Sequence, residues 1–204
     1  MMLVRIPRSG RPARSSTRAS ATAKGQGGFT LLEVMFAAAV LAIAISGSAG
    51  AMLSAMQLDR MNRERALALQ SARRVIEQAQ GVEFSEVFAA YNSVAGDDPA
   101  AMVAAGTVPG ASFTCAGLTV QNNDPDGMAG EIILTVIQNG GVLELREDFV
   151  DVGLGMPMDL NMDGVIDALD HSGDYLILPL RVRLSWTGAA GPRSADLVTI
   201  LSER

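Results

Sequence analysis

The stretch GGFTLLEV, residues 27–34, opens an apolar run that continues to about Leu58. Glu33 is the one ionisable side chain between Phe29 and Leu58. A helix that crosses a membrane needs about 20 mostly apolar residues, so this run is long enough to span a bilayer. A carboxylate costs about 2.5–3.5 kcal/mol at the centre of a membrane and less near its surface. We therefore expect a specific partner for the charge of Glu33.

This stretch resembles the processing site of type IV pilins and of the pseudopilins of type II secretion. The resemblance implies that a prepilin peptidase in the membrane cuts after Gly28 and that the new terminal residue, Phe29, is methylated. It also implies that Glu33 meets the terminal amine of its own or a neighbouring subunit when subunits assemble through their helices. Such an opposite charge would offset part of the cost of removing the carboxylate from water. The expected partners are the peptidase, the inner membrane and other pilin or pseudopilin subunits.

The charges are distributed unevenly along the chain. Its overall charge is −6, but all 22 acidic residues follow residue 28. The preceding residues form a basic leader, 1–28, which we expect to be removed; its basic residues are Arg5, Arg8, Arg11, Arg14, Arg18 and Lys24. Because positive flanks stay in the cytoplasm, we predict a single-pass inner-membrane protein with a periplasmic or extracytoplasmic C-terminal domain. An acidic body also argues against nucleic acid as a partner.

A cleaved secretory signal is the alternative interpretation of the N-terminus. Its hydrophobic region would run from Leu31 to Ile45, and small residues at 49–51 would form the cleavage site, which makes Met52 the first mature residue. Glu33 inside that region and the match over residues 28–33 favour the prepilin interpretation. The leader is longer than is usual in pilins, and a later translation start is a further alternative.

No proline occurs between residues 29 and 81, so one long helix is the simplest prediction. We expect residues 29–58 to be a transmembrane and assembly helix, continued by an amphipathic helix that ends at Gly81. Apolar residues at steps of three and four would lie on one face of the continuation. These residues are Leu69, Ala72, Ile76 and Ala79. Residues 59–111 would comprise this continuation, a short helix over 83–91 and a variable loop over 92–111.

Two glycines interrupt the apolar helix at Gly47 and Gly50. Glycine costs up to about 1 kcal/mol relative to alanine inside a helix, so this is its weakest part. The glycines indicate either a point that bends or melts during assembly, or close packing against another helix.

Residues 112–204 alternate apolar and polar side chains, which predicts an antiparallel sheet of four or five strands. The expected strands cover residues 113–120, 131–138, 142–149, 176–186 and 196–201. The Asn139-Gly140 pair predicts a tight hairpin turn, and Pro179 predicts an edge position or a bulge. The amphipathic half of the long helix would cover the apolar face of the sheet. We therefore predict an α+β fold.

An acidic loop, DLNMDGVIDALD, occupies residues 159–170. Oxygen-bearing side chains stand at positions 1, 3, 5, 9 and 12 and glycine stands at position 6, which is the spacing of an EF-hand loop in its dockerin-like form. Five side chains and one backbone carbonyl would bind a calcium ion. The side chains are those of Asp159, Asn161, Asp163, Asp167 (directly or through water) and Asp170, and the carbonyl is that of Val165. The helices that flank an EF-hand are not predicted here, and a solvated acidic loop is the alternative.

The remaining reactive side chains are few. Cys115 is the single cysteine and is expected to be a small buried residue in a strand. His171 is the single histidine and, without a histidine or cysteine nearby in sequence, is interpreted as a loop residue. No nucleophile motif or phosphate loop occurs, so an enzyme is not expected. The single cysteine and compact length resemble a minor pilin or minor pseudopilin. A membrane-anchored or secreted calcium-dependent binding or adhesion module is the alternative function.

Overall fold

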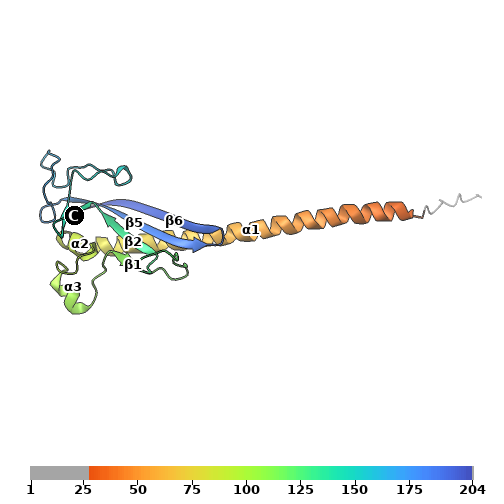
Figure 1. The fold of residues 1–204 in the computed structure, drawn as a ribbon, viewed down its shortest axis with the longest axis horizontal. Helices are drawn as coiled ribbons and strands as arrows, with labels where there is room; N and C mark the ends of the chain where they lie inside the picture. The colour runs from red at the N-terminus through yellow and green to blue at the C-terminus, as the bar shows by residue number, and fades with distance from the viewer. Residues whose placement is uncertain (1–27, 204) are drawn as a thin grey trace, which may run out of the picture. The chain divides into compact units, whose positions relative to one another are not determined.

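The computed structural model describes residues 28–203, so the predicted leader falls outside the described residues except for Gly28. The fold is α+β, as predicted (Figure 1). Its helices are α1 (Leu31–Gln80), α2 (Phe84–Tyr91), α3 (Ala100–Ala105) and the 3₁₀ turn η1 (Val152–Leu154). Its strands are β1 (Ser112–Phe113), β2 (Gly130–Leu134), β3 (Val136–Asn139), β4 (Val142–Leu145), β5 (Ile177–Gly188) and β6 (Gly191–Ser202).

The chain divides after Ser48 into two compact units. In the first unit, the described residues form the start of α1, and their side chains are all exposed. α1 contains an 18-residue window with a mean hydropathy of 2.1, none of it buried. By length and composition this helix can cross a membrane, and the predicted single helix over residues 29–81 is confirmed.

In the second unit, the C-terminal part of α1 packs into the hydrophobic core. The predicted apolar face is confirmed, with Leu69 at its half-buried margin. The buried residues of the helix are Ala68, Ala72, Val75, Ile76 and Ala79. They share one core cluster with the inward side chains of β5, which are Leu178, Leu180, Val182, Leu184 and Trp186. Each large apolar side chain buried in this way contributes about 1.5–3 kcal/mol.

The main sheet has four antiparallel strands in the order β1-β2-β5-β6. The predicted strand 176–186 is confirmed as β5, and the last strand is longer than predicted. The pairing of β5 with β6 continues through Pro179 without a bulge, so that alternative is wrong. β2 ends opposite Leu180, so β5 has only one neighbour at Pro179, and this residue occupies a local edge position as predicted. The missing N–H of Pro179 therefore breaks no ladder on the β2 side.

Two other strand predictions are wrong in extent. The strand predicted over 113–120 is only β1, because the chain then turns at Gly117 and packs on α1, where Cys115 Sγ lies 2.9 Å from Ser71 Oγ. Cys115 is buried as predicted, but not in a strand. The strand predicted over 131–138 is divided at Thr135 into β2 and β3, which belong to different sheets.

The predicted hairpin is present as β3 and β4, but its turn lies one residue later than predicted. Asn139 is the last residue of β3 and pairs with Val142, so the two turn residues are Gly140 and Gly141, with φ of 58° and 92°. Glycine supplies these positive φ values without steric cost. The return strand ends at Leu145 instead of Phe149, because the chain beyond it enters the long connection 146–176. α2 is confirmed, whereas α3 interrupts the predicted loop 92–111.

A bidentate ion pair attaches residues 146–176, the connection between β4 and β5, to strand β5. Arg181 Nη1 and Nη2 donate to Asp151 at 2.9 and 2.7 Å, and Arg181 is almost fully buried. The hydrogen bonds from Arg181 hold the pKa of Asp151 below its ordinary value. Asp151 also accepts from the N–H groups of Gly153 and Leu154 at the start of η1. One carboxylate therefore orders both the turn and its contact with the sheet.

We expect Asp151→Asn to lower the urea midpoint at neutral pH while keeping an acceptor oxygen for η1. Because the pKa of Asp151 is lower in the folded chain than its unfolded value of about 3.9, the pair stabilises the fold fully above that pH. This contribution is lost as the pH falls through the folded pKa, and the variant should lack that part of the acid dependence. The matched control is Asp196→Asn, which breaks the half-exposed pair with Arg183 and should have a smaller effect. Equal effects of the two variants would contradict the prediction.

Candidate functional site

The predicted processing stretch is exposed at the start of α1. Gly28, Phe29 and Thr30 precede the helix, and the side chain of Phe29 is 80% exposed. Among residues 28–203, no atom lies within 4 Å of a Cβ atom added at Gly28. The fold therefore gives no steric reason for glycine at this position, and a requirement for it would come from a molecule that acts on the chain.

The N-terminus of α1 supplies a local reason for Glu33 that the sequence analysis missed. Thr30 Oγ1 accepts from the N–H of Glu33 at 3.3 Å, and the Thr30 carbonyl accepts from Glu33 and Val34. Thr30 thus caps the helix, and Glu33 lies in its first turn, where a negative charge is stabilised by about 0.3–1 kcal/mol. The pattern Thr-x-x-Glu is the sequence signal of a capping box and could have been recognised.

Gly47 and Gly50 lie in continuous helix and also have no atom within 4 Å of an added Cβ. Within the described residues, nothing requires glycine at either position. The two interpretations of these glycines, bending during assembly and close helix packing, both remain predictions.

In the acidic loop, the first three predicted calcium ligands share one turn. Asp159 Oδ2 accepts from Gly164 N–H at 2.8 Å, Asn161 Oδ1 from Asp163 N–H at 3.0 Å, and Asp163 Oδ1 from Val165 N–H at 2.8 Å. The other oxygen of Asp159, Oδ1, is buried and has no hydrogen-bond partner within residues 28–203. The predicted glycine turn is present, with φ of 90° at Gly164.

The last two predicted side-chain ligands are directed elsewhere. Asp167 Oδ1 accepts from Leu169 N–H at 2.8 Å and lies 3.2 Å from His171 Nε2. Asp170 Oδ1 accepts from Leu145 N–H at the end of β4 and from Ser172 N–H, both at 3.0 Å. The structure therefore brings three of the predicted side chains together and uses the other two to attach the loop to its surroundings.

Glu147 is a site residue that the sequence analysis missed. Its side chain is fully buried. Oε1 accepts from the N–H groups of Leu160 at 2.6 Å and Asn161 at 3.2 Å, and Oε2 accepts from Asp167 N–H at 3.3 Å. One carboxylate thus satisfies backbone groups at two places in the acidic loop. A signal existed: alternation that points Leu143 and Leu145 inward also points Glu147 inward.

His171 lies in a loop as predicted, but it is buried among carboxylates. Its Nδ1 is 3.1 Å from Asp174 Oδ1, and its Nε2 is 3.2 Å from Asp167 Oδ1 and 3.7 Å from Glu147 Oε2. Burial alone lowers the pKa of His171, but the hydrogen bonds to Asp167 and Asp174 and the charge of Glu147 outweigh it, so the pKa is raised overall. Glu147, Asp167 and His171, termed the Glu147 cluster below, could hold a metal ion.

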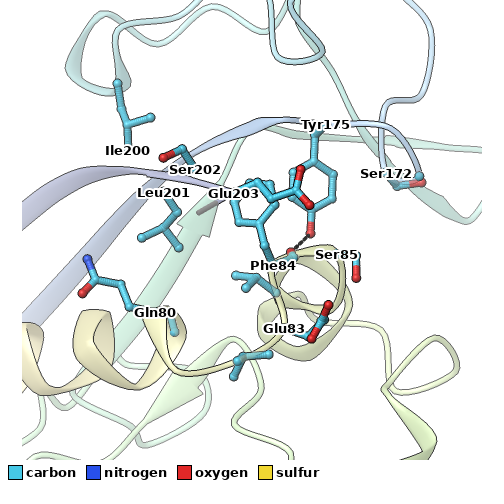
Figure 2. Close-up of a pocket in the computed structure, with 14 residues that line it drawn as sticks. Gln80, Glu83, Phe84, Ser85, Ser172, Tyr175, Ile200, Leu201, Ser202 and Glu203 are labelled. Atoms are coloured by element: carbon cyan, nitrogen blue, oxygen red, sulfur yellow. Dashed lines mark hydrogen bonds between the residues drawn. The ribbon is translucent and has the colours of Figure 1, made fainter.

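A hollow of about 430 Å³ separates the start of α2 from the end of β6 (Figure 2). Tyr175 lines it, and its hydroxyl donates to the Phe84 carbonyl at 2.6 Å and accepts from Phe88 N–H at 3.2 Å. The rings of Tyr175 and Phe84 lie 5.0 Å apart. This side chain therefore attaches α2 to the segment that leads into β5.

One family model matches the chain, described as the prokaryotic N-terminal methylation motif, over residues 23–49. The searches of curated proteins and of solved structures returned no match. The matched range includes the predicted cleavage and methylation residues and the start of the apolar helix. The resemblance drawn from residues 27–34 is thereby confirmed: the chain carries a prepilin-type N-terminal motif, consistent with a type IV pilin-like protein. The motif and the apolar helix fit a membrane-anchored subunit.

We expect Tyr175→Phe to destabilise the fold by about 1–2 kcal/mol, because it removes two buried hydrogen bonds to α2. The matched control is Tyr91→Phe. The Tyr91 hydroxyl is buried without a partner in the described part of the chain, and burial raises its pKa to about 12. Removing an unpaired buried hydroxyl should be neutral or stabilising. Thermal melting of the two variants checks this, and a larger loss for Tyr91→Phe would contradict the assignment.

Proposed function

We propose that the chain is a prepilin-like structural subunit, of the minor type, in a type IV pilus or a type II secretion pseudopilus. The observation that carries the proposal is the methylation motif placed directly before an apolar half-helix whose side chains the chain itself leaves uncovered. Processing after Gly28 would place Phe29 at the mature N-terminus. Other subunits and the prepilin peptidase would be its partners.

The exposed side chains of α1 support this proposal. Ile43 is 74% exposed and Leu53 is 63% exposed. Apolar surface of this extent needs a cover, because leaving each large side chain in water forfeits about 1.5–3 kcal/mol. Inner-membrane lipid would supply the cover before assembly, and the helices of neighbouring subunits would supply it in the filament. The basic leader would keep the N-terminus in the cytoplasm and the acidic domain outside it.

The same motif supports a structural role rather than an enzymatic one. The Asp151–Arg181 pair attaches the 146–176 segment to β5, and Glu147 holds two parts of that segment together through their backbone N–H groups. Calcium at residues 159–170 belongs to this proposal as a structural ion, supported by the shared turn of Asp159, Asn161 and Asp163.

We expect the mature protein, isolated from membranes of a host that contains a prepilin peptidase, to begin at a methylated Phe29. Gly28→Val should abolish processing, while the melting temperature of the domain should not change because the space at Gly28 is free. Gly47→Ala, equally unobstructed, is the control and should be processed normally. Intact-mass spectrometry reads out all three proteins. A mature protein that begins at Met52 would contradict the proposal and indicate secretory cleavage.

Glu33→Gln should leave processing intact and reduce incorporation into filaments at least tenfold, because the amide cannot neutralise the terminal amine of a packed subunit. The helix start should remain, since the cap uses the backbone N–H of residue 33. Asp59→Asn, which removes an exposed carboxylate beyond the apolar run, is the control. Quantitative immunoblots of sheared filaments measure incorporation. Equal incorporation of the two variants would show that the Glu33 charge has no role in assembly.

A further inference from the structure

The connection 146–176 has almost no regular structure, since η1 is its one helical turn and no strand of the described chain lies in it. A long irregular segment in a compact domain is uncommon and needs something other than a hydrogen-bonded ladder to order it. The Glu147 cluster joins the beginning of this connection, at residue 147, to its end, at residues 167 and 171. A single ligand bound at this cluster would therefore hold the two ends of the connection together.

The charges of the cluster are not balanced. Glu147 is fully buried, and Asp167 and Asp174 both lie within 3.2 Å of the His171 ring. Within residues 28–203, neither an arginine nor a lysine forms an ion pair with Glu147 or Asp167; Arg146, the nearest in sequence, pairs with Glu144 and Asp148. Even a fully protonated imidazole would supply one positive charge to three carboxylates. Of these carboxylates only Glu147 is fully buried, since the side chains of Asp167 and Asp174 are 33% and 59% exposed. Because a buried charge is tolerated when it is paired or bound to a metal, Glu147 is the group that favours a further cation.

The geometry suits a small tetrahedral cation. Ligand atoms bound at about 2.0–2.1 Å in a tetrahedron lie about 3.3 Å from one another. His171 Nε2 is 3.2 Å from Asp167 Oδ1 and 3.7 Å from Glu147 Oε2, and all three ligand atoms lie within 4.8 Å of one another. The side chain of Asp167 is 33% exposed, so water can complete the fourth position.

The groups behind the ligands already hold them in place. Asp174 Oδ1 lies 3.1 Å from His171 Nδ1 and would keep the proton on that nitrogen, which leaves Nε2 free to bind a metal. The N–H groups of Leu160 and Asn161 hold Glu147 through Oε1. Oε2 accepts a longer hydrogen bond of 3.3 Å from Asp167 N–H and lies 3.7 Å from His171 Nε2. Such supporting contacts orient metal ligands in characterised sites.

We propose that the Glu147 cluster binds one zinc-like divalent cation, through Glu147 Oε2, Asp167 Oδ1 and His171 Nε2, and that this ion closes the 146–176 connection. A mixed set of one nitrogen and two oxygens favours zinc over calcium, which prefers six to eight oxygens. The role is structural and does not depend on filament assembly. A failure of prepilin processing would leave this site untouched, and a failure to bind zinc would leave the proposed function untouched.

Zinc titration of the full-length chain in detergent micelles tests the proposal. The protein should be stripped with a chelator and carry no histidine tag, because His171 is its single histidine. Calorimetry should show one Zn²⁺ per chain, and the melting temperature should rise by roughly 5–10 °C at a hundredfold excess over Kd. Co²⁺ in place of Zn²⁺ should give the strong visible absorption of a four-coordinate site. No binding of either ion to the wild-type chain would overturn the proposal.

Three variants assign the ligands. His171→Gln and Asp167→Asn should each lose zinc binding and the cobalt spectrum. Asp163→Asn is the control, because Asp163 belongs to the predicted calcium ligands but not to the cluster, and it should bind zinc as the wild type does. If His171→Gln does not fold, Asp167→Asn and the cobalt spectrum of the wild type still test whether the cluster binds the metal. Zinc binding that survives both cluster variants, or that is lost in Asp163→Asn, would overturn the assignment.

Discussion

The fold depends on the packing of α1 against the apolar face of β5. Ala68, Ala72 and Ala79 are almost completely buried. They share one core cluster with the large apolar residues of β5, which fill the space between helix and strand. At the edge of this contact, Trp186 Nε1 donates to Glu64 Oε2 at 3.3 Å, which satisfies the one polar atom of the indole.

Polar groups contribute to the order on the opposite side of β5. Arg181 is buried there against Asp151, and the connection 146–176 is ordered by carboxylates that accept backbone N–H groups. Buried polar networks of this kind specify one arrangement, because an unpaired member costs about 1–3 kcal/mol. A domain whose single cysteine is free can gain rigidity in this way, and a bound cation would add to it.

Glu33 and Glu147 therefore use their carboxylates in different ways. Glu33 lies in the first turn of α1, exposed, with its backbone N–H held by the Thr30 cap. Its charge is stabilised locally by the helix dipole and remains available to a partner outside the chain. Glu147 is buried and already bound to the backbone, so its partner must fit the space that the fold leaves. The first suits assembly with other subunits, and the second suits the internal stability of the domain.

The sequence by itself determined the motif at residues 27–34, the length of α1, its buried face, the alternation of β5 and the hairpin at residues 136–145. Each of these is a local pattern, because helical and strand periods and turn residues act over a few neighbouring positions. Only the tertiary structure decided where the strand over 131–138 divides, why Pro179 is tolerated in a central strand, and which side chains surround His171. Those outcomes depend on Thr135, on the end of β2 and on Glu147. Pairing and burial between segments that are distant in the sequence bring these parts together, so a local sequence pattern does not predict them.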